Sequence, residues 1–218
     1  MIDVVIVDDH PVVRAGLREI LGATGEARVA AEFASAEELL SRLAGLACDL
    51  VLLDIRLPGI DGLEALRRIR RLRPGLPVLI LSVYAEEQFA LRALRAGASG
   101  YLTKESAPEE LLRALRRVAS GGRFLSASFA EKLALSPFGG KTHRLPHERL
   151  SDRELQVLCL LAGGIPQAEI ARRLRLSPKT VATYRSRIAE KIGLATTAEL
   201  IAYAIRNGLC EEGKPSSA

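Results

Sequence analysis

The sequence predicts an α/β fold class: a doubly wound (βα)₅ domain with a parallel sheet, followed by a small all-α domain of four helices. Two observations predict it. Short branched-aliphatic runs alternate with amphipathic segments over residues 1–120, whereas only helical periods follow Leu150. A polar stretch punctuated by glycine and proline separates the two patterns. We therefore expect a first domain over residues 1–120, a linker over 121–148, a second domain over 149–212 and a flexible tail over 213–218.

The first domain contains runs with the length and composition of buried strands, at residues 2–7, 29–33, 50–53, 78–81 and, more briefly, 100–102. Helical patterns lie between them, at residues 12–21, 36–43, 63–72, 86–96 and 108–120. Nearly continuous hydrophobic strands joined by helices indicate a parallel sheet that is covered on both faces. Such sheets place their functional sites at the carboxyl ends of the strands.

The second domain has helical periods at residues 152–162, 167–174, 178–192 and 197–207, and residues 129–135 of the linker have a helical pattern as well. Breaks at Gly163-Gly164, Leu176-Ser177 and Gly193 separate the four helices. Short helices with short connections predict a compact helical domain.

Composition narrows the class of protein. No run of about eighteen uncharged apolar residues occurs, and the N-terminus lacks the pattern of a signal peptide. We expect a cytoplasmic protein with no membrane partner. The 3 cysteines, Cys48, Cys159 and Cys210, are an odd number without metal-ligand spacing. Reduced thiols are expected, with neither disulfides nor zinc.

The net positive charge of the chain lies in its C-terminal part. Residues 141–218 carry 13 lysines and arginines against 8 acids, whereas residues 1–140 carry 18 of each, so the excess of +5 belongs to the second region. This asymmetry suggests a polyanionic partner. The alternative is a solvated surface on which arginine is in excess by chance.

Carboxylates follow two of the predicted strands. Asp8 and Asp9 come directly after the first strand, and Asp54 ends the third. Because parallel strands end at the same edge of a sheet, these acids are expected to lie together, where a hard cation such as Mg²⁺ would offset their repulsion. Taken singly, the pair at 8–9 could instead cap the helix that Pro11 begins, and Asp54 could be a turn residue.

A hydroxyl and an ammonium group are predicted at the same edge. Ser82 ends the fourth strand and Lys104 follows the fifth. Three acids, a hydroxyl and a lysine have the chemistry of a phosphoryl site, because a carboxylate can attack phosphorus while cations neutralise the phosphoryl oxygens. Alone, Ser82 would be a strand-terminal polar residue and Lys104 a solvated lysine.

These motifs resemble a known family. Residues 7–11 (VDDHP), 53–62 (LDIRLPGIDG) and 97–104 (GASGYLTK) resemble the receiver domain of NarL/FixJ-type response regulators. The resemblance implies that a sensor histidine kinase phosphorylates Asp54. It also implies Mg²⁺ ligation by Asp9, Asp54 and the Arg56 backbone carbonyl, with Asp8 acting partly through water. Ser82 and Tyr101 would be a switch pair, and Lys104 would contact the phosphoryl group.

The helix predicted at 178–192 is a candidate recognition helix. Ser177 is placed to cap it and Pro178 suits its first turn. An apolar stripe through Val181 and Ile188 can pack inward, which leaves basic and small polar side chains facing outward. Such a face can meet phosphates and base edges, although a basic solvated face is the alternative.

The C-terminal sequence also resembles a family. The run 150–154 (LSDRE), Ile170-Ala171, Thr180-Val181 and residues 190–193 (EKIG) are similar to the LuxR-type helix-turn-helix domain. The resemblance implies double-stranded DNA as partner, with RNA polymerase as a further candidate, and a homodimer on activation. The DNA-binding candidates are Lys179, Thr180, Ala182, Thr183, Arg185, Ser186 and Arg187, and the dimerisation candidates are Leu200, Ile201 and Ile205. For any one of the last three, packing inside the domain is the alternative.

Three positions depart from the usual pattern of that family. Ala182 stands where lysine is frequent, Pro166 where a capping serine or threonine is usual, and Ala168 where a phosphate-contacting lysine is common. These departures leave the fold prediction unchanged. They put in doubt which bases are contacted through Thr183 and Ser186, whereas Lys179, Arg185 and Arg187 are expected to contact phosphates.

Three functions remain in competition. The first is a transcription regulator in which phosphorylation promotes dimerisation and promoter binding. The second binds DNA without that control, which the complete set of site residues disfavours. The third is a phosphohydrolase with an aspartyl nucleophile. Dehalogenase-like phosphatases use a second acid two residues after the nucleophile, and that position is Arg56 here. We therefore expect the protein not to be an enzyme.

Overall fold

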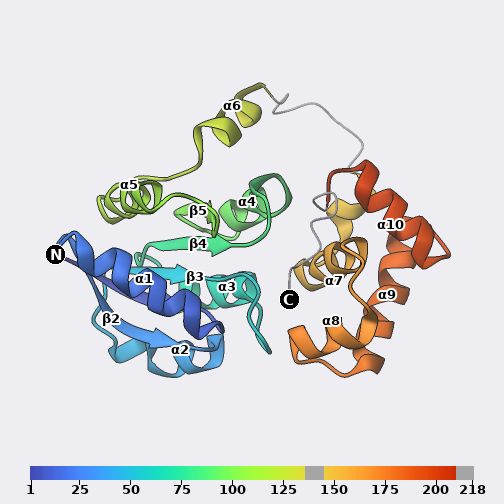
Figure 1. Cartoon of the computed structure of the whole chain (residues 1–218), viewed down its shortest axis with the longest axis horizontal. Helices are drawn as coiled ribbons and strands as arrows, with labels where there is room; N and C mark the ends of the chain where they lie inside the picture. Colours follow the sequence, from blue (N-terminus) through green and yellow to red (C-terminus); the bar gives the residue numbers. More distant parts are fainter. Residues whose placement is uncertain (136–144, 210–218) are drawn as a thin grey trace. The chain divides into compact units, whose positions relative to one another are not determined.

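The computed structural model describes residues 1–135 and 145–209, which belong to two compact units (Figure 1). Residues 1–135 lie in the first unit and residues 145–209 in the second. The tail predicted at 213–218, Cys210 and residues 136–144 of the predicted linker lie outside the described residues. The domain boundaries stay predictions.

The first unit alternates strands and helices as the sequence predicts. In chain order its elements are β1 (Ile2–Val7), α1 (Pro11–Ala23), β2 (Ala27–Phe33), α2 (Ala36–Arg42), a short 3₁₀ turn η1 (Leu43–Gly45), β3 (Leu50–Leu53), α3 (Gly62–Leu72), β4 (Val78–Ser82), α4 (Glu86–Arg95), β5 (Gly100–Thr103) and α5 (Pro108–Ala119). The strands form one parallel sheet in the order β2-β1-β3-β4-β5. The predicted (βα)₅ fold is confirmed.

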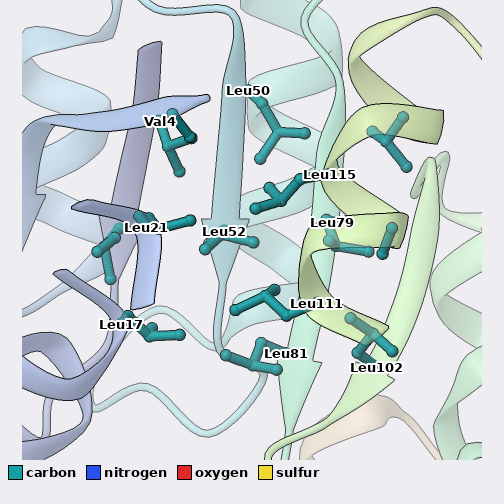
Figure 2. Packing of buried hydrophobic residues seen from close by; sticks show 14 residues of the cluster. Val4, Leu17, Leu21, Leu50, Leu52, Leu79, Leu81, Leu102, Leu111 and Leu115 are labelled. Carbon is teal, nitrogen blue, oxygen red and sulfur yellow. The ribbon is translucent and has the colours of Figure 1, made fainter. Parts of the chain in front are cut away.

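Helices cover both faces of the sheet. Right-handed crossovers place α1 on one face and α2, α3 and α4 on the other. The helix α5 returns to the face of α1, where Leu111 and Leu115 join Leu17 and Leu21 in one buried cluster (Figure 2). Alternate strand residues supply the sheet side of this cluster, among them Val4, Leu50, Leu52, Leu79, Leu81 and Leu102. Residues of the opposite parity face α2, α3 and α4, which explains why the central strands are hydrophobic throughout.

Arg70 joins α3 to the segments that precede β4 and β5. Its guanidinium donates hydrogen bonds to the carbonyl oxygens of Gly97 at 2.7 Å, Pro74 at 2.9 Å and Leu76 at 2.8 Å. It also donates to Ser99 Oγ at 3.1 Å. One half-buried cation thus satisfies acceptors from two loops.

Replacing Arg70 with alanine is expected to lower the free energy of unfolding of the first unit by about 2 kcal/mol, because hydrogen bonds from a charged donor are lost. Urea denaturation measures the change. Arg71→Ala is the matched control: the Arg71 side chain is 72% exposed and lies 3.9 Å from Glu64. It should change the same free energy by less than about 0.5 kcal/mol. Equal losses in the two variants would contradict the role given to Arg70.

The chain after α5 forms another helix, α6 (Ala127–Leu135). It begins two residues before the predicted helical segment at 129–135. Ser126 explains the earlier start, because its Oγ accepts a hydrogen bond from the Phe129 amide at 3.2 Å and so caps the first turn.

The second unit is entirely helical over the residues that the structure describes. Its elements are a 3₁₀ turn η2 (Pro146–Arg149) and the helices α7 (Asp152–Ala162), α8 (Gln167–Leu174), α9 (Pro178–Ile192) and α10 (Thr197–Arg206). Capping boxes start two of the helices, Ser151 with Glu154 in α7 and Thr196 with Glu199 in α10. The left-handed Gly193 ends α9. The predicted four-helix domain is confirmed, and no helix within the described ranges has the length and apolar character to cross a bilayer.

Candidate functional site

The predicted acids lie at neighbouring strand ends. Asp8 follows β1 and Asp54 follows β3, and these strands pair with each other at the point where the strand order reverses. Backbone hydrogen bonds continue past the strands, from the Asp54 amide to Val7 O at 2.9 Å and from the Asp8 amide to Phe33 O at 3.1 Å. The acids are therefore held by the ends of the sheet, where doubly wound folds place their sites.

Lys104 binds two of the acids. Its Nζ lies 2.5 Å from Asp8 Oδ2 and 2.7 Å from Asp54 Oδ2, and its side chain is only 10% exposed. Its backbone amide donates to Ser82 O at 2.7 Å, which fixes the segment after β5 beside the end of β4. The structure thus brings together residues from the ends of β1, β3, β4 and β5, as the sequence predicts.

The environment of Asp54 opposes its ionisation. Burial raises the pKa of this carboxyl above its ordinary value, attraction to Lys104 lowers it, and repulsion from Asp8 raises it again. Asp54 Oδ1 accepts a hydrogen bond from the Arg56 amide at 3.0 Å. A cation placed among these acids would relieve the repulsion between them.

The donor set suits a divalent cation. Asp8, Asp9, His10 and Asp54 each offer a ligand atom, and these atoms lie within 4.8 Å of one another. Asp9 Oδ1 is buried and accepts no hydrogen bond among the described residues, although His10 Nδ1 lies 2.8 Å from it. Carboxylate oxygens are the ligands that Mg²⁺ prefers, so the residues fit this ion. Ligation of Mg²⁺ by the Arg56 backbone carbonyl stays a prediction.

His10 was not among the predicted site residues. It directly follows the two aspartates, and that adjacency is the signal that could have identified it. The alternative role of Asp8 and Asp9, capping the helix that Pro11 begins, can be compared with the structure. The N-cap residue of α1 is His10 rather than either aspartate, and the His10 side chain makes no capping hydrogen bond.

The predicted switch residues lie side by side. Ser82 is fully buried, and its Oγ accepts a hydrogen bond from the Tyr84 amide at 3.2 Å. The Tyr101 hydroxyl donates to Tyr84 O at 2.7 Å, and the Tyr101 side chain is fully buried. Burial raises the pKa of Tyr101, while a hydrogen bond with Ser82 acts against it. Tyr84 is thus held between the two residues that the resemblance assigns to the switch.

The helices α8 and α9 form a helix-turn-helix pair joined by residues 175–177. Arg175 makes the turn in the left-handed region, with φ of 50°. Ser177 Oγ then accepts from the Thr180 amide at 3.0 Å and caps α9, and Pro178 occupies its first turn. On the inner face, Val181 and Ile188 are fully buried, and α9 packs against α7 and α8.

The outward face of α9 carries Lys179, Thr183, Ser186 and Arg187, all exposed, whereas Thr180, Ala182 and Arg185 are half-buried. The Thr183 hydroxyl donates to Lys179 O at 3.0 Å and the Ser186 hydroxyl to Ala182 O at 3.1 Å. Arg185 Nη1 donates to Thr197 Oγ1 on α10 at 3.3 Å. The exposed members form one stripe with helical spacing, and Arg185 points away from it.

One of the family departures, Pro166, lies at the start of α8, and the arginines of this helix are paired with an acid. Pro166 precedes this helix and supplies no side-chain cap. Two arginines of α8 pair with one acid: Glu169 accepts from Arg172 at 2.7 and 2.8 Å and from Arg173 at 2.7 Å. These hydrogen bonds lower the pKa of Glu169 to about 2. Much of the positive charge of α8 is therefore neutralised locally.

The predicted dimerisation residues differ in exposure. Leu200 is 1% exposed, Ile201 is half-buried and Ile205 is 44% exposed. For Leu200 the structure favours the packing alternative. Ile201 and Ile205 remain available at the surface of α10.

Comparison with known proteins covers both units. Residues 4–116 match the family described as the response regulator receiver domain, and residues 148–204 match the luxR family of bacterial regulatory proteins. Response regulator GacA of Pseudomonas aeruginosa is 39% identical over 211 residues, which is 97% of this chain and 99% of that protein. Response regulator UvrY of Escherichia coli K12 is 40% identical over 217 residues, with 100% of both chains covered.

A solved structure is similar across both units. RcsB from Salmonella enterica serovar Typhimurium, bound to promoter P1flhDC in the presence of the phosphomimetic BeF₃⁻, gives a TM-score of 0.65 at 28% identity. The match covers 93% of this chain and 97% of that chain.

Proposed function

The chain belongs to the two-component response regulators that join a receiver domain to a LuxR-type DNA-binding domain, and from this we propose that phosphorylation of Asp54 by a sensor histidine kinase controls its binding to promoters. We further propose that the phosphorylated form binds double-stranded DNA as a homodimer. RNA polymerase is a candidate partner at the promoter. The proposed boundaries are those of the sequence prediction: receiver 1–120, linker 121–148, DNA-binding domain 149–212 and tail 213–218.

The contact of Lys104 with Asp54 and Asp8 is the observation that carries the proposal. An ammonium within 2.7 Å of the Asp54 carboxylate can neutralise phosphoryl oxygens attached to that carboxylate. Asp54 is then the nucleophile, and Lys104 positions and stabilises the transferred group. This is a single transfer to the protein, so the chain acts as a regulator rather than as an enzyme that turns over a substrate.

The proposed Mg²⁺ ligands are Asp8, Asp9, Asp54 and the Arg56 carbonyl. Bound Mg²⁺ would supply positive charge that lowers the repulsion between the acids and the incoming phosphoryl group. Asp9 Oδ1 supports this assignment, because it is buried and accepts no hydrogen bond among the described residues, although it lies 2.8 Å from His10 Nδ1.

Ser82 and Tyr101 are proposed to transmit the change. A hydroxyl at the end of β4 can donate to the phosphoryl group, and the buried Tyr101 ring then repacks into the space that Ser82 leaves. The hydrogen bonds of both residues to Tyr84 support this role, because they link the site to the segment that begins α4.

The proposed DNA interface is the exposed stripe of α9. Lys179 and Arg187 would contact phosphates, and Thr183 and Ser186 lie where short side chains can approach base edges. Thr180, Ala182 and Arg185 are secondary candidates because they are half-buried. The RcsB structure bound to a promoter supports DNA as the partner of this chain, since RcsB is similar to this chain across both units.

One experiment tests the control of DNA binding by phosphorylation together with the proposed DNA interface. Duplexes are selected from a random library with the protein in beryllofluoride and Mg²⁺, and the affinity for the selected duplex is then measured with and without beryllofluoride. Because dimerisation lets two half-site contacts act together, we expect affinity to rise by at least about 10-fold on activation. Arg187→Ala should weaken binding in both states and reduce its dependence on salt. Unchanged wild-type affinity under a demonstrated load of beryllofluoride would refute the control by phosphorylation.

A further inference from the structure

The segment after α5 returns along β5 (Figure 1, between α5 and α6). We call residues 122–126 the docking segment. The left-handed Gly121, with φ of 82°, turns the chain at the end of α5. The Phe124 amide then donates to Ser99 O at 3.0 Å, and Phe124 O accepts from the Tyr101 amide at 3.2 Å. The docking segment therefore makes a parallel bridge to the outer side of β5.

Gly100 permits this close approach. A Cβ atom at position 100 would lie 2.7 Å from Phe124 O and 2.9 Å from Leu79 Cδ1, closer than side-chain atoms normally come. The Phe124 ring packs against the buried cluster between the sheet and α5. The first attachment of the docking segment thus combines backbone pairing with burial of an aromatic ring.

A second attachment lies at the start of α4. The Ser126 amide donates to Glu86 Oε1 at 3.2 Å, and the Ser126 hydroxyl donates to Glu86 Oε2. Glu86 is only 8% exposed. A buried carboxylate is costly unless donors satisfy it, and Ser126 supplies a described donor to each of its oxygens. This contact joins residues that are 40 positions apart in the chain.

Both attachments adjoin the switch residues. The amide of Tyr101 holds Phe124, while the hydroxyl of Tyr101 holds Tyr84. Glu86 follows Tyr84 by two residues, and the Tyr84 amide is in turn held by Ser82. The short loop that leads into α4 is thus fixed through its contacts with Ser82 and Tyr101.

We propose that the docking segment is a phosphorylation-dependent contact: modification of Asp54 detaches Ser126 from Glu86. The proposal rests on the proposed function. When Ser82 donates to the phosphoryl group and Tyr101 repacks, Tyr84 loses both of its described hydrogen bonds to the switch residues. The start of α4 is then no longer fixed, and Glu86 moves away from Ser126. The chain is thereby released from the start of α4 at Ser126, the residue that directly precedes α6.

Amide hydrogen exchange of the full-length protein tests this coupling at single residues. The amides of Phe124 and Ser126 are followed by NMR with Mg²⁺ alone and with Mg²⁺ plus beryllofluoride. We expect exchange at Ser126 to be about 10-fold faster with beryllofluoride, the size that follows from losing a hydrogen bond to a charged acceptor. The fluorine signal of the bound mimic reports how fully the site is loaded.

Two glutamate variants distinguish loss of the Glu86–Ser126 contact from a general loosening of the receiver. Glu86→Ala is expected to speed exchange at Ser126 without beryllofluoride and to remove most of the further increase when beryllofluoride is added. Glu109→Ala is the matched control, because Glu109 is an exposed glutamate in the first turn of α5. It should leave the exchange of Ser126 as slow as in the wild type.

The outcomes separate the two proposals. A fully loaded site with unchanged exchange at Ser126 would overturn the coupling and leave the phosphorylation site intact. Failure of beryllofluoride to bind in the presence of Mg²⁺ would overturn the proposed function and, with it, the coupling. Equal acceleration in Glu86→Ala and Glu109→Ala would also overturn the coupling, because the Glu86 contact would then have no specific role.

Discussion

Asp54→Ala is expected to accept no phosphoryl group from acetyl phosphate, whereas the wild-type chain gains the mass of one such group. The substitution removes one of the two carboxylates that Lys104 contacts, and the contact with Asp8 is left. Intact-mass spectrometry measures the label. The same variant should show no gain in DNA affinity when beryllofluoride is added.

This loss is expected without loss of folding. Burial opposes ionisation of Asp54 and Asp8 repels it, so removing the carboxylate relieves an unfavourable arrangement. The free energy of unfolding should fall by no more than about 1 kcal/mol. Asp49→Ala is the control, since Asp49 is an exposed aspartate outside the acidic cluster, and it should be labelled like the wild type. Normal labelling of Asp54→Ala would assign the phosphoacceptor to another residue.

Gly62→Ala is expected to lower the free energy of unfolding of the receiver unit by about 3 kcal/mol, through overpacking that side chains cannot relieve. A Cβ at position 62 would lie 2.0 Å from Asp54 O and 2.6 Å from Ile55 Cα, both backbone atoms. The Gly62 amide also donates to Ile55 O at 2.9 Å, so α3 cannot shift without moving the segment that carries the phosphoacceptor. Urea denaturation measures the loss, and acetyl phosphate labelling should slow in parallel.

A second glycine-to-alanine change is a control that should alter the free energy of unfolding in the opposite direction. Gly16 lies within α1, and a Cβ there would meet nothing within 4 Å. Gly16→Ala should raise the free energy of unfolding by about 0.5–1 kcal/mol, because alanine loses less backbone entropy in a helix. If both variants lost the same stability, the close approach of Gly62 to Asp54 would not be the cause.

The fold was predictable where local signals and burial agree. The helices α7, α8 and α9 have the predicted limits. For α7 and α9 the reason is that a capping serine and a glycine bound a regular apolar period, whereas α8 lies between Pro166 and the left-handed Arg175. The strand β2 begins at Ala27, two residues before the prediction. Ala27 and Arg28 do not extend the apolar run, yet their backbones pair with Ile2 and Asp3 of β1. Edge strands pair through the backbone whatever their side chains are, so composition alone cannot place their ends.

Part of the candidate site was predictable from the positions of its residues after the predicted strands. Asp8 and Asp54 directly follow apolar runs, and Lys104 directly follows β5, so parallel topology alone brings them to one end of the sheet. The contact of Glu86 with Ser126 follows no periodic pattern, because it depends on the path that the chain takes after α5. Arg185 was expected at phosphates from its charge, but it donates to Thr197, whose position depends on how α10 packs.

The pairing of Phe124 with β5 also bears on solubility. A strand at the margin of a sheet presents unpaired backbone groups, and these are a template for aggregation. On β2, the opposite margin, Arg28 and Glu32 carry charges that pair with Asp3 and Arg18, and charged side chains hinder a foreign strand from adding there. At β5, the backbone of Phe124 occupies hydrogen-bonding groups of the edge strand and so hinders a foreign strand from adding there. Any state of the protein in which Phe124 leaves β5 therefore exposes the backbone of this edge strand to pairing with another chain.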